Sequence, residues 1–183
     1  ASSVATTFAL SLADVTAVAG TDYTGVLTNA AFSNGVTISG GTITVPAGVT
    51  SFTVTVPTSA DTIDEANETY TLTVGGQSGT GTINDDDAAP TISSVSSASN
   101  TEASDIVHTV TLSNASSSAT TFALSLADVT ALAGTDYTGV LTNAAFSNGV
   151  TISGGTITVP AGVTSFTVTV PTSADTIDEA NET

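Results

Sequence analysis

Apolar and hydroxyl-bearing residues alternate along much of the chain. In the segment 51–56, Phe52, Val54 and Val56 are separated by threonines. Strict alternation predicts half-buried β-strands, and no segment carries the 3.6-residue period of an amphipathic helix. Further segments show the same alternation at Phe8/Leu10/Leu12, Ile43/Val45, Tyr70/Leu72/Val74 and Val110/Leu112. The pattern therefore predicts an all-β fold of short antiparallel strands.

Turn-forming residues separate the predicted strands. Asn-Gly, Gly-Gly and Ala-Gly pairs lie in segments 33–35, 39–41 and 46–48, where positive φ angles cost little. Short strands with turns at this spacing are typical of an immunoglobulin-like antiparallel β-sandwich with Greek-key connections. The glycine-rich segment 75–81 matches neither a nucleophile elbow nor a phosphate-binding loop, and we interpret it as a hairpin turn.

A long internal repeat organises the chain. Residues 1–69 recur as residues 115–183, 114 positions later, with Ser118 in place of Val4 and Leu132 in place of Val18. A period of this length is that of a whole domain and not of a solenoid unit. We therefore expect two tandem β-sandwich repeats, 1–87 and 88–183, the first lacking its first strands and the second its last. We expect the chain to be an internal piece of a longer array.

Composition narrows the possible functions. The chain has 17 Asp and Glu residues, no Lys or Arg, and a formal net charge of -17. A nucleic-acid-binding protein needs cationic side chains against phosphates, and a basic membrane-surface patch needs them too. We therefore expect neither nucleic-acid binding nor direct membrane insertion, and no apolar run approaches the ~20 residues of a membrane span. Without cysteine the chain has no disulfide and no thiolate metal ligand.

The acidic residues are concentrated in two places. Asp61, Asp64, Glu65 and Glu68 follow one predicted strand closely, and Asp85–Asp87 end the first repeat. Two carboxylates at ~4 Å repel by about 4 kcal/mol at an effective dielectric constant of ~20, and the chain has no Lys or Arg to offset this repulsion. Clustered carboxylate oxygens in loops favour Ca²⁺. A solvated acidic surface that keeps the protein soluble explains the same composition.

Two other features invite catalytic readings. His108 is the single histidine and is in phase with Ile106 and Val110, which favours a partly buried sheet position over a catalytic base. Paired carboxylates occur in glycosidases, but such sites lie in aromatic-lined clefts, and this chain has no Trp, three Tyr and six Phe, with Phe at inward strand positions. We expect no enzymatic activity.

Three motifs, taken together and in order, resemble the Calx-β domain as it occurs in tandem arrays of giant bacterial RTX-type surface adhesins secreted by type I systems. The resemblance covers nearly the whole chain. The first motif is Ala-Gly-Thr-Asp-Tyr at 19–23 and again at 133–137. The second is the acidic segment 61–70 that follows the threonine-rich strand, and the third is the segment 79–87 that ends in the aspartate run.

The resemblance implies Ca²⁺ bound at one pole of each sandwich. It also implies that Glu68 and Glu182 point outward, since each lies next to the following strand. Thr62, Asn67 and Ala103 depart from the family pattern, in which an Asp, an acidic residue and a Gly are common at these positions. The implied ligands are Asp22, Asp61, Glu65, Asp85, Asp86 and Asp87 in the first repeat, and Glu102, Asp136, Asp175 and Glu179 in the second.

The resemblance further implies a structural role. We expect an extender repeat of a long extracellular adhesin on a bacterial surface, rigidified by Ca²⁺ at the domain pole and linker. Its partners are then neighbouring repeats of the same polypeptide, and other domains bind the adhesive ligand. Two alternatives remain open: a module that itself binds a sugar or ice, and a Ca²⁺-sensing regulatory domain.

Overall fold

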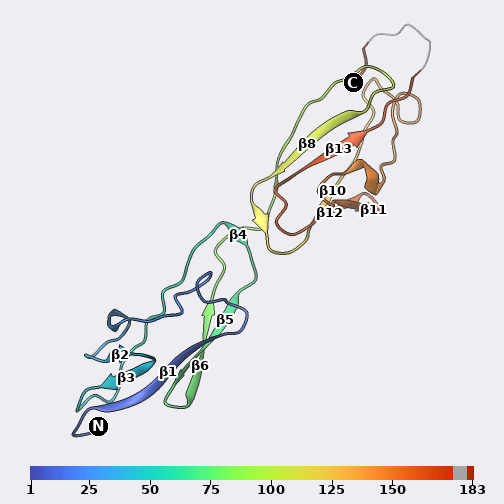
Figure 1. Cartoon of the computed structure of the whole chain (residues 1–183). Coiled ribbons are helices and arrows are strands. Elements are labelled where there is room, and N and C mark those ends of the chain that lie inside the picture. Colours follow the sequence, from blue (N-terminus) through green and yellow to red (C-terminus); the bar gives the residue numbers. More distant parts are fainter. Residues whose placement is uncertain (175–180) are drawn as a thin grey trace. The chain divides into compact units, whose positions relative to one another are not determined.

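The computed structural model describes residues 1–174 and 181–183 of the chain. Strands dominate, and among the described residues the only helices are two single 3-10 turns, η1 (Asn29–Ala31) and η2 (Asn143–Ala145) (Figure 1). No helix in this part of the chain is long and apolar enough to span a membrane. The chain folds as two compact units, Ala1–Asp61 with Ala66–Asp86, and Thr62–Glu65 with Asp87–Thr183. The prediction of an all-β, antiparallel architecture is confirmed.

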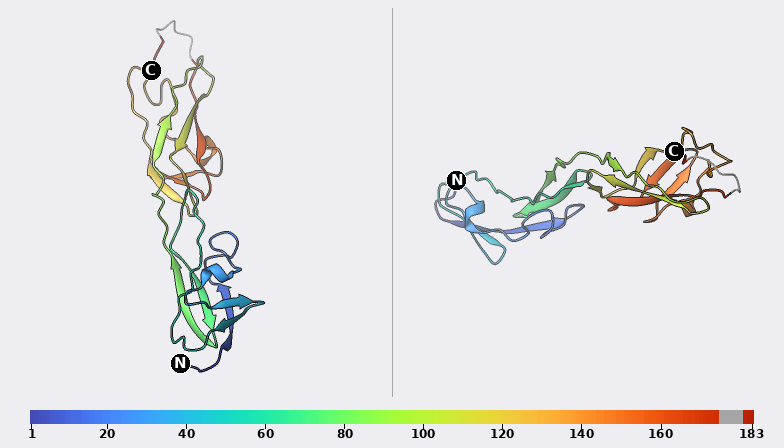
Figure 2. Two further views of the ribbon diagram at one scale, coloured as in Figure 1. Left: turned by 90° about the vertical axis from the view of Figure 1, so that its left-hand side faces the viewer. Right: turned by 90° about the horizontal axis from the view of Figure 1, so that it is seen from above.

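The first unit contains a five-stranded antiparallel sheet in the order β2-β3-β1-β5-β6. Its strands are β1 (Thr6–Asp14), β2 (Thr37–Ser39), β3 (Thr42–Val45), β5 (Glu68–Val74) and β6 (Gln77–Ile83). β1 pairs with β3 through its first half and with β5 through its second half. In Figure 2, β1 is the blue strand and β5 and β6 form the green hairpin that lies beside it.

Glycine pairs form the tight hairpin turns. Gly75 and Gly76 join β5 to β6, and both have positive φ angles, 58° and 83°. Two-residue hairpin turns with positive φ at both positions match the right-handed twist of the flanking strands. The predicted hairpin turn is therefore confined to these two residues, and the rest of the segment 75–81 continues as β6.

The second unit contains two three-stranded antiparallel sheets, β10-β12-β11 and β13-β8-β7, and the short parallel pair β4-β9. In the β4-β9 pair, Ser116 is 2% exposed and its hydroxyl donates to the carbonyl of Asp64 (3.2 Å). The strands are β4 (Ile63–Asp64), β7 (Ile92–Val95), β8 (Ile106–Leu112), β9 (Ala115–Ser116), β10 (Thr120–Ala123), β11 (Thr151–Ser153), β12 (Thr156–Val159) and β13 (Ser165–Val170).

Each unit has its own apolar core. The core of the first unit is built on Leu10, Leu27, Val36, Ile43 and Val45. The core of the second unit is larger, because β8 and β13 contribute to it from one sheet and β12 from the other. Its buried members are Val110, Leu112, Val150, Ile157, Val159, Phe166, Val168 and Val170.

Identical sequences adopt different secondary structure in the two units. Residues 165–170 form β13, which pairs with β8 over its whole length. The same six residues at 51–56 form no strand, and a single antiparallel bridge links Val54 to Phe32. Residues 91–114 supply β7 and β8 to the second unit.

The first strand of the repeated segment is longer in the first unit than in the second. β1 extends to Asp14 because its second half pairs with β5. The same sequence in the second unit gives β10, which ends at Ala123 and pairs with β12 alone. Burial follows pairing: Leu10, which pairs with β5, is 8% exposed, whereas its counterpart Leu124 is half-buried.

One expected core position lies nearer the surface than its phase suggests. Phe8 alternates with Leu10 and Leu12, yet it is 41% exposed while Leu10 is 8% exposed. The expectation that the phenylalanines occupy inward positions is therefore wrong for Phe8. Its ring lies against the turn glycine Gly75, at the end of the sheet.

The unequal burial of two identical phenylalanines yields a prediction. Phe166 is 1% exposed, whereas Phe52 is half-buried. Replacing a buried Phe by Ala costs about 3–5 kcal/mol, so we expect Phe166→Ala to destabilise the second unit by this amount. We expect Phe52→Ala to cost the first unit roughly half as much, because less apolar surface is lost from its core.

The measurement is denaturant unfolding of the two single variants, with each unit followed separately by amide hydrogen exchange. Equal losses in the two units would contradict the assignment of a better filled core to the second.

Candidate metal centre

Three carboxylates converge at the start of β5. Asp22, Glu65 and Glu68 each offer one oxygen, and these oxygens all lie within 4.8 Å of one another. All three side chains are half-buried. Glu68 is the first residue of β5, and Glu65 lies three residues before it in the chain. Sequence neighbours 65 and 68 are thus brought to a residue more than forty positions earlier in the chain.

The loop that carries Asp22 is held by its own hydrogen bonds. The Asp22 carboxylate accepts a bond from the Val18 N–H (2.7 Å), and the Asp22 N–H donates to the Val18 carbonyl (2.9 Å). Gly20 has a φ of 90°, which permits the tight turn between them. The Ser59 N–H donates to the Asp22 carbonyl (2.9 Å) and ties this turn to the segment that leads towards Asp61.

A buried tyrosine next to Asp22 supports the same loop. Tyr23 is 1% exposed, its hydroxyl donates to Asp14 Oδ1 (2.6 Å), and its ring stacks on Tyr70 of β5 with centroids 4.6 Å apart. Asp14 Oδ1 also accepts a bond from the Ala19 N–H (3.0 Å). The hydrogen bond to Asp14, together with burial, raises the pKa of Tyr23 from 10.0 to about 12. Two hydrogen bonds and an aromatic stack therefore hold in place the loop that carries the Asp22 carboxylate.

Gly81 makes room for this aromatic pair. Gly81 is the register partner of Tyr70 on β6, and a Cβ at this position would collide with the Tyr70 ring. The absence of a side chain lets the ring lie across the β5-β6 hairpin. Its position there allows it to stack on Tyr23.

The second unit has the same hydrogen bonds around Asp136 that the first unit has around Asp22. Tyr137 donates to Asp128 Oδ1 (2.6 Å), and the Asp136 carboxylate accepts from the Leu132 N–H (2.7 Å). The hydrogen bond from Tyr137, then the one from the Ala133 N–H, lowers the pKa of Asp128. The hydrogen bond to Asp128 likewise raises the pKa of Tyr137. Asp136 therefore lies in a turn equivalent to the one that contains Asp22.

Glu102 lies in a turn that reaches the same loops. The Ala103 N–H donates to the Ser173 carbonyl (3.3 Å), and the Ser173 N–H donates to the Asp136 carbonyl (2.9 Å). Ala103 has a φ of 62°, a conformation that glycine adopts more easily. The departure from glycine noted at this position therefore puts a residue with a Cβ into a conformation that costs it energy.

The other predicted ligands have different placements. Asp61 and Asp86 are exposed, Asp85 and Asp87 are half-buried, and none of them joins the three-carboxylate group. The Asp85 N–H donates to the side-chain oxygen of Asn67 (3.0 Å), which links the aspartate run to the residue before Glu68. Glu102 and Asp136 are not part of any such group among the described residues. Asp175 and Glu179 lie outside the described residues.

Glu68 corrects the sequence-based expectation. It was expected to point outward, and its carboxylate instead belongs to the converging group. The physical reason is the period of two along β5: Glu68 is in phase with Tyr70, Leu72 and Val74, of which the last two pack on the core. That phase was a signal in the sequence. Glu182 is exposed and does not belong to a carboxylate group among residues 1–174 and 181–183.

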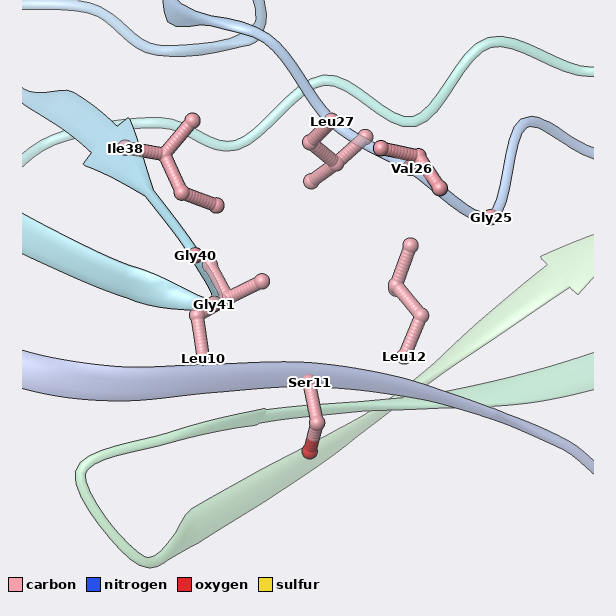
Figure 3. Close-up of a pocket in the computed structure, with 9 residues that line it drawn as sticks. All are labelled: Leu10, Ser11, Leu12, Gly25, Val26, Leu27, Ile38, Gly40 and Gly41. Carbon is pink, nitrogen blue, oxygen red and sulfur yellow. The ribbon is translucent and has the colours of Figure 1, made fainter.

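Neither His108 nor the described pocket has the composition of an active site. His108 is half-buried in β8, as predicted, and its Nδ1 lies 2.8 Å from the Ser96 carbonyl. A pocket of about 280 Å³ in the first unit is lined mainly by Leu10, Leu12, Leu27 and Ile38, with glycines at its rim. Ser11 is its only hydroxyl-bearing residue, and Figure 3 shows this side chain turned away from the leucines. The pocket has no titratable lining residue.

The three carboxylates carry a substantial electrostatic cost when all are ionised. At this spacing each pair repels by about 3–4 kcal/mol at an effective dielectric constant near 20. The chain has no Lys or Arg to offset this repulsion. An all-oxygen, all-anionic ligand set of this kind fits a hard divalent cation such as Ca²⁺.

The antiparallel sheets and the converging carboxylates fit a calcium-binding β-sandwich module. The Calx-beta domain family matches residues 3–95 and 84–162. The chain therefore belongs to the Calx-beta domain family. Neither the comparison with curated proteins nor that with solved structures gave a match.

The Tyr23–Asp14 bond gives a prediction for pH dependence. Because the pKa of Tyr23 in the folded protein lies above its ordinary value, the bond's contribution to stability is complete below about pH 10 and is lost as pH rises through about 12. Asp14→Asn removes the charge that holds the phenol protonated, so we expect the pKa of Tyr23 to fall towards 10.0.

Titration of labelled tyrosine by NMR measures this pKa directly. Asp105→Asn, at an exposed carboxylate in the other unit, is the matched control and should leave Tyr23 unchanged. An unaltered Tyr23 titration in Asp14→Asn would show that the bond does not set the pKa.

Proposed function

We propose that the chain is a calcium-stabilised extender repeat of a long surface adhesin. The observation that carries the proposal is the convergence of Asp22, Glu65 and Glu68 in a chain without Lys or Arg. Membership of the Calx-beta domain family supports calcium as the ion. The near-identity of the two copies of the 69-residue segment supports a structural role, because specialised binding sites favour divergence between copies.

In this proposal, Ca²⁺ binds in the first repeat to Asp22, Glu65 and Glu68, with Asp61 and the Asp85–Asp87 run completing the oxygen shell. Ca²⁺ takes six to eight oxygens, more than three monodentate carboxylates provide. The hydrogen bond from Asp85 N–H to Asn67 supports recruitment of the aspartate run, because it ties the run to the residue before Glu68. The ligands of the second repeat are Glu102, Asp136, Asp175 and Glu179.

The mechanical consequence concerns the junction between repeats. The Asp85–Asp87 run ends the first repeat, and two alanines separate it from Pro90. A cation bound by this run and by the loops of the preceding sandwich restricts rotation about the junction, so that successive repeats act as a stiff spacer. Neighbouring repeats of the same polypeptide are then the partners, and other domains of an extracellular bacterial surface protein bind the adhesive ligand.

Calcium binding by the carboxylate group is testable by calorimetry. Extracellular calcium modules bind with Kd values of ~10⁻⁴–10⁻³ M. We expect the double variant Asp22→Asn, Glu68→Gln to weaken binding in the first repeat at least tenfold, which is about 1.4 kcal/mol. It should also lose most of the ~2.7 kcal/mol of stabilisation that the wild type gains at a hundredfold excess of free Ca²⁺ over Kd.

Asp105→Asn is the control, because it removes one negative charge at an exposed position outside the proposed ligand set. Wild-type protein that shows neither heat of binding nor a calcium-dependent rise in Tm would support the solvated acidic surface instead.

The extender role is tested by length. Small-angle scattering of the chain should give a larger radius of gyration and a narrower distance distribution with millimolar Ca²⁺ than with chelator. Identical scattering curves would separate the two parts of the proposal, since calcium could then stabilise each fold without stiffening the junction.

A further inference from the structure

Two threonines join the loop that follows β1 to the start of β5. The Thr16 N–H donates to the Thr69 carbonyl (3.0 Å), and the Thr69 N–H donates back to Thr16 Oγ1 (2.8 Å). The N–H of the buried residue Ala17 donates to the same carbonyl (3.0 Å). Thr69 directly follows Glu68 in the chain. The loop is therefore bonded to β5 beside one carboxylate of the candidate metal centre.

Asp14, at the end of β1, bonds both ends of the turn that carries a second carboxylate of this centre. Its Oδ1 accepts from the Ala19 N–H (3.0 Å) and from the Tyr23 hydroxyl (2.6 Å). Residues 19 and 23 also form a β-bridge with each other, and Asp22 lies between them. Residues 14 and 16 together thus connect the turn of Asp22 to the strand that begins with Glu68.

The second unit contains both sets of bonds. The Thr130 N–H donates to the Thr183 carbonyl (2.8 Å), and the Thr183 N–H donates back to Thr130 Oγ1 (2.7 Å). Asp128 Oδ1 accepts from the Ala133 N–H (2.9 Å) and from the Tyr137 hydroxyl (2.6 Å). The same bonds therefore form in both copies of the repeated segment.

These bonds oppose the repulsion between the carboxylates that they bring together. Oxygens of Asp22 and Glu68 lie within 4.8 Å of each other, and the chain has no Lys or Arg beside them. Without a cation, this repulsion acts to separate the turn from the strand. The bonds between Thr16 and Thr69 join uncharged groups and do not require an ion, so they hold the two elements together before the ion binds. A site whose ligands are already gathered pays less ordering entropy on binding.

We propose that Asp14 and Thr16 are positioning residues of the calcium site in the first repeat, an inference that rests on the function proposed above. Neither belongs to the converging carboxylate group. They act through Asp22 and Glu68, by holding the turn of one against the strand of the other. Ca²⁺ takes six to eight oxygens, whereas Mg²⁺ keeps several waters and needs only one or two carboxylates. Gathering the carboxylates in advance therefore favours Ca²⁺ over Mg²⁺.

The test compares Thr16→Val with Thr16→Ser in the chain of 183 residues. Valine has nearly the shape of threonine but offers no oxygen to the Thr69 N–H, whereas serine keeps the acceptor. The Kd values of Ca²⁺ and of Mg²⁺ are measured by NMR titration at the amides of residues 20–24. We expect Thr16→Val to raise the Kd of Ca²⁺ about tenfold and that of Mg²⁺ less than about twofold. Thr16→Ser should stay within about twofold of the wild type for both ions.

Thr7→Val is the matched control. It makes the same substitution at an exposed threonine of β1, in the half of the strand that pairs with β3. It should leave both Kd values unchanged. Amide hydrogen exchange with chelator present tests the bond itself without an ion: exchange at Thr69 should be about tenfold faster in Thr16→Val than in Thr16→Ser.

A second pair of variants decides the matter if Thr16→Val does not fold. Asp14→Asn keeps an oxygen for the Ala19 N–H and the Tyr23 hydroxyl, whereas Asp14→Ala keeps none. We expect Asp14→Ala to lose Ca²⁺ affinity about tenfold and Asp14→Asn to retain most of it. Equal losses in the two variants would make Asp14 a direct ligand and would overturn its positioning role.

The failures of the two proposals are distinguishable. Wild-type protein that binds Ca²⁺, together with a Thr16→Val variant that binds it equally well, would overturn the positioning role alone. A variant that weakens Ca²⁺ and Mg²⁺ by the same factor would do so too, because general destabilisation of the first unit affects both ions. Wild-type protein that binds no Ca²⁺ would overturn the proposed function and this inference with it.

Discussion

The fold depends on backbone pairing between strands that the chain supplies from distant positions. A strand of alternating valine and threonine has no internal hydrogen bonds, so it persists as a ladder strand where a neighbour meets its edge. Ser165–Val170 has β8 as that neighbour and forms β13, with its phenylalanine buried. Pairing and burial reinforce each other, because the partner strand that satisfies the backbone also brings the apolar side chains that close the core.

Electrostatics place a second constraint on the same architecture. With 17 carboxylates and no Lys or Arg, the protein cannot neutralise its acidic loops internally, and every carboxylate needs water, an N–H donor, a hydroxyl or a bound cation. The structure uses two of these solutions side by side. Asp14 receives a tyrosine hydroxyl and a backbone N–H, whereas Asp22, Glu65 and Glu68 are gathered together. The first arrangement anchors the loop, and the second presents oxygens that suit a divalent ion.

The candidate site shows where sequence reasoning reached its limit. Family resemblance pointed to Asp22 and Glu65, and the structure brings both into one group with Glu68. Proximity to the next strand misled the expectation for Glu68, although its phase with Leu72 and Val74 indicated the inner face. The support from Asp14 and Tyr23 was not anticipated, because a hydrogen bond across nine residues has no periodic signature. The carboxylates of such a site come from loops that are far apart in the sequence. The number of residues between them does not tell how far apart they lie in space.

The sequence by itself determined the fold class, the strand phases and the hairpin turns. These depend on local properties: alternation decides which face of a strand is apolar, and paired glycines such as Gly75 and Gly76 permit positive φ. Only the tertiary structure decided which of these strands form. Identical residues are a strand at 165–170 and not at 51–56, and β1 runs five residues further than its copy β10. The physical reason is that the strand to which a segment hydrogen-bonds lies elsewhere in the chain. The segment's own sequence determines which side chains share a face, but not whether a neighbouring strand pairs with its backbone.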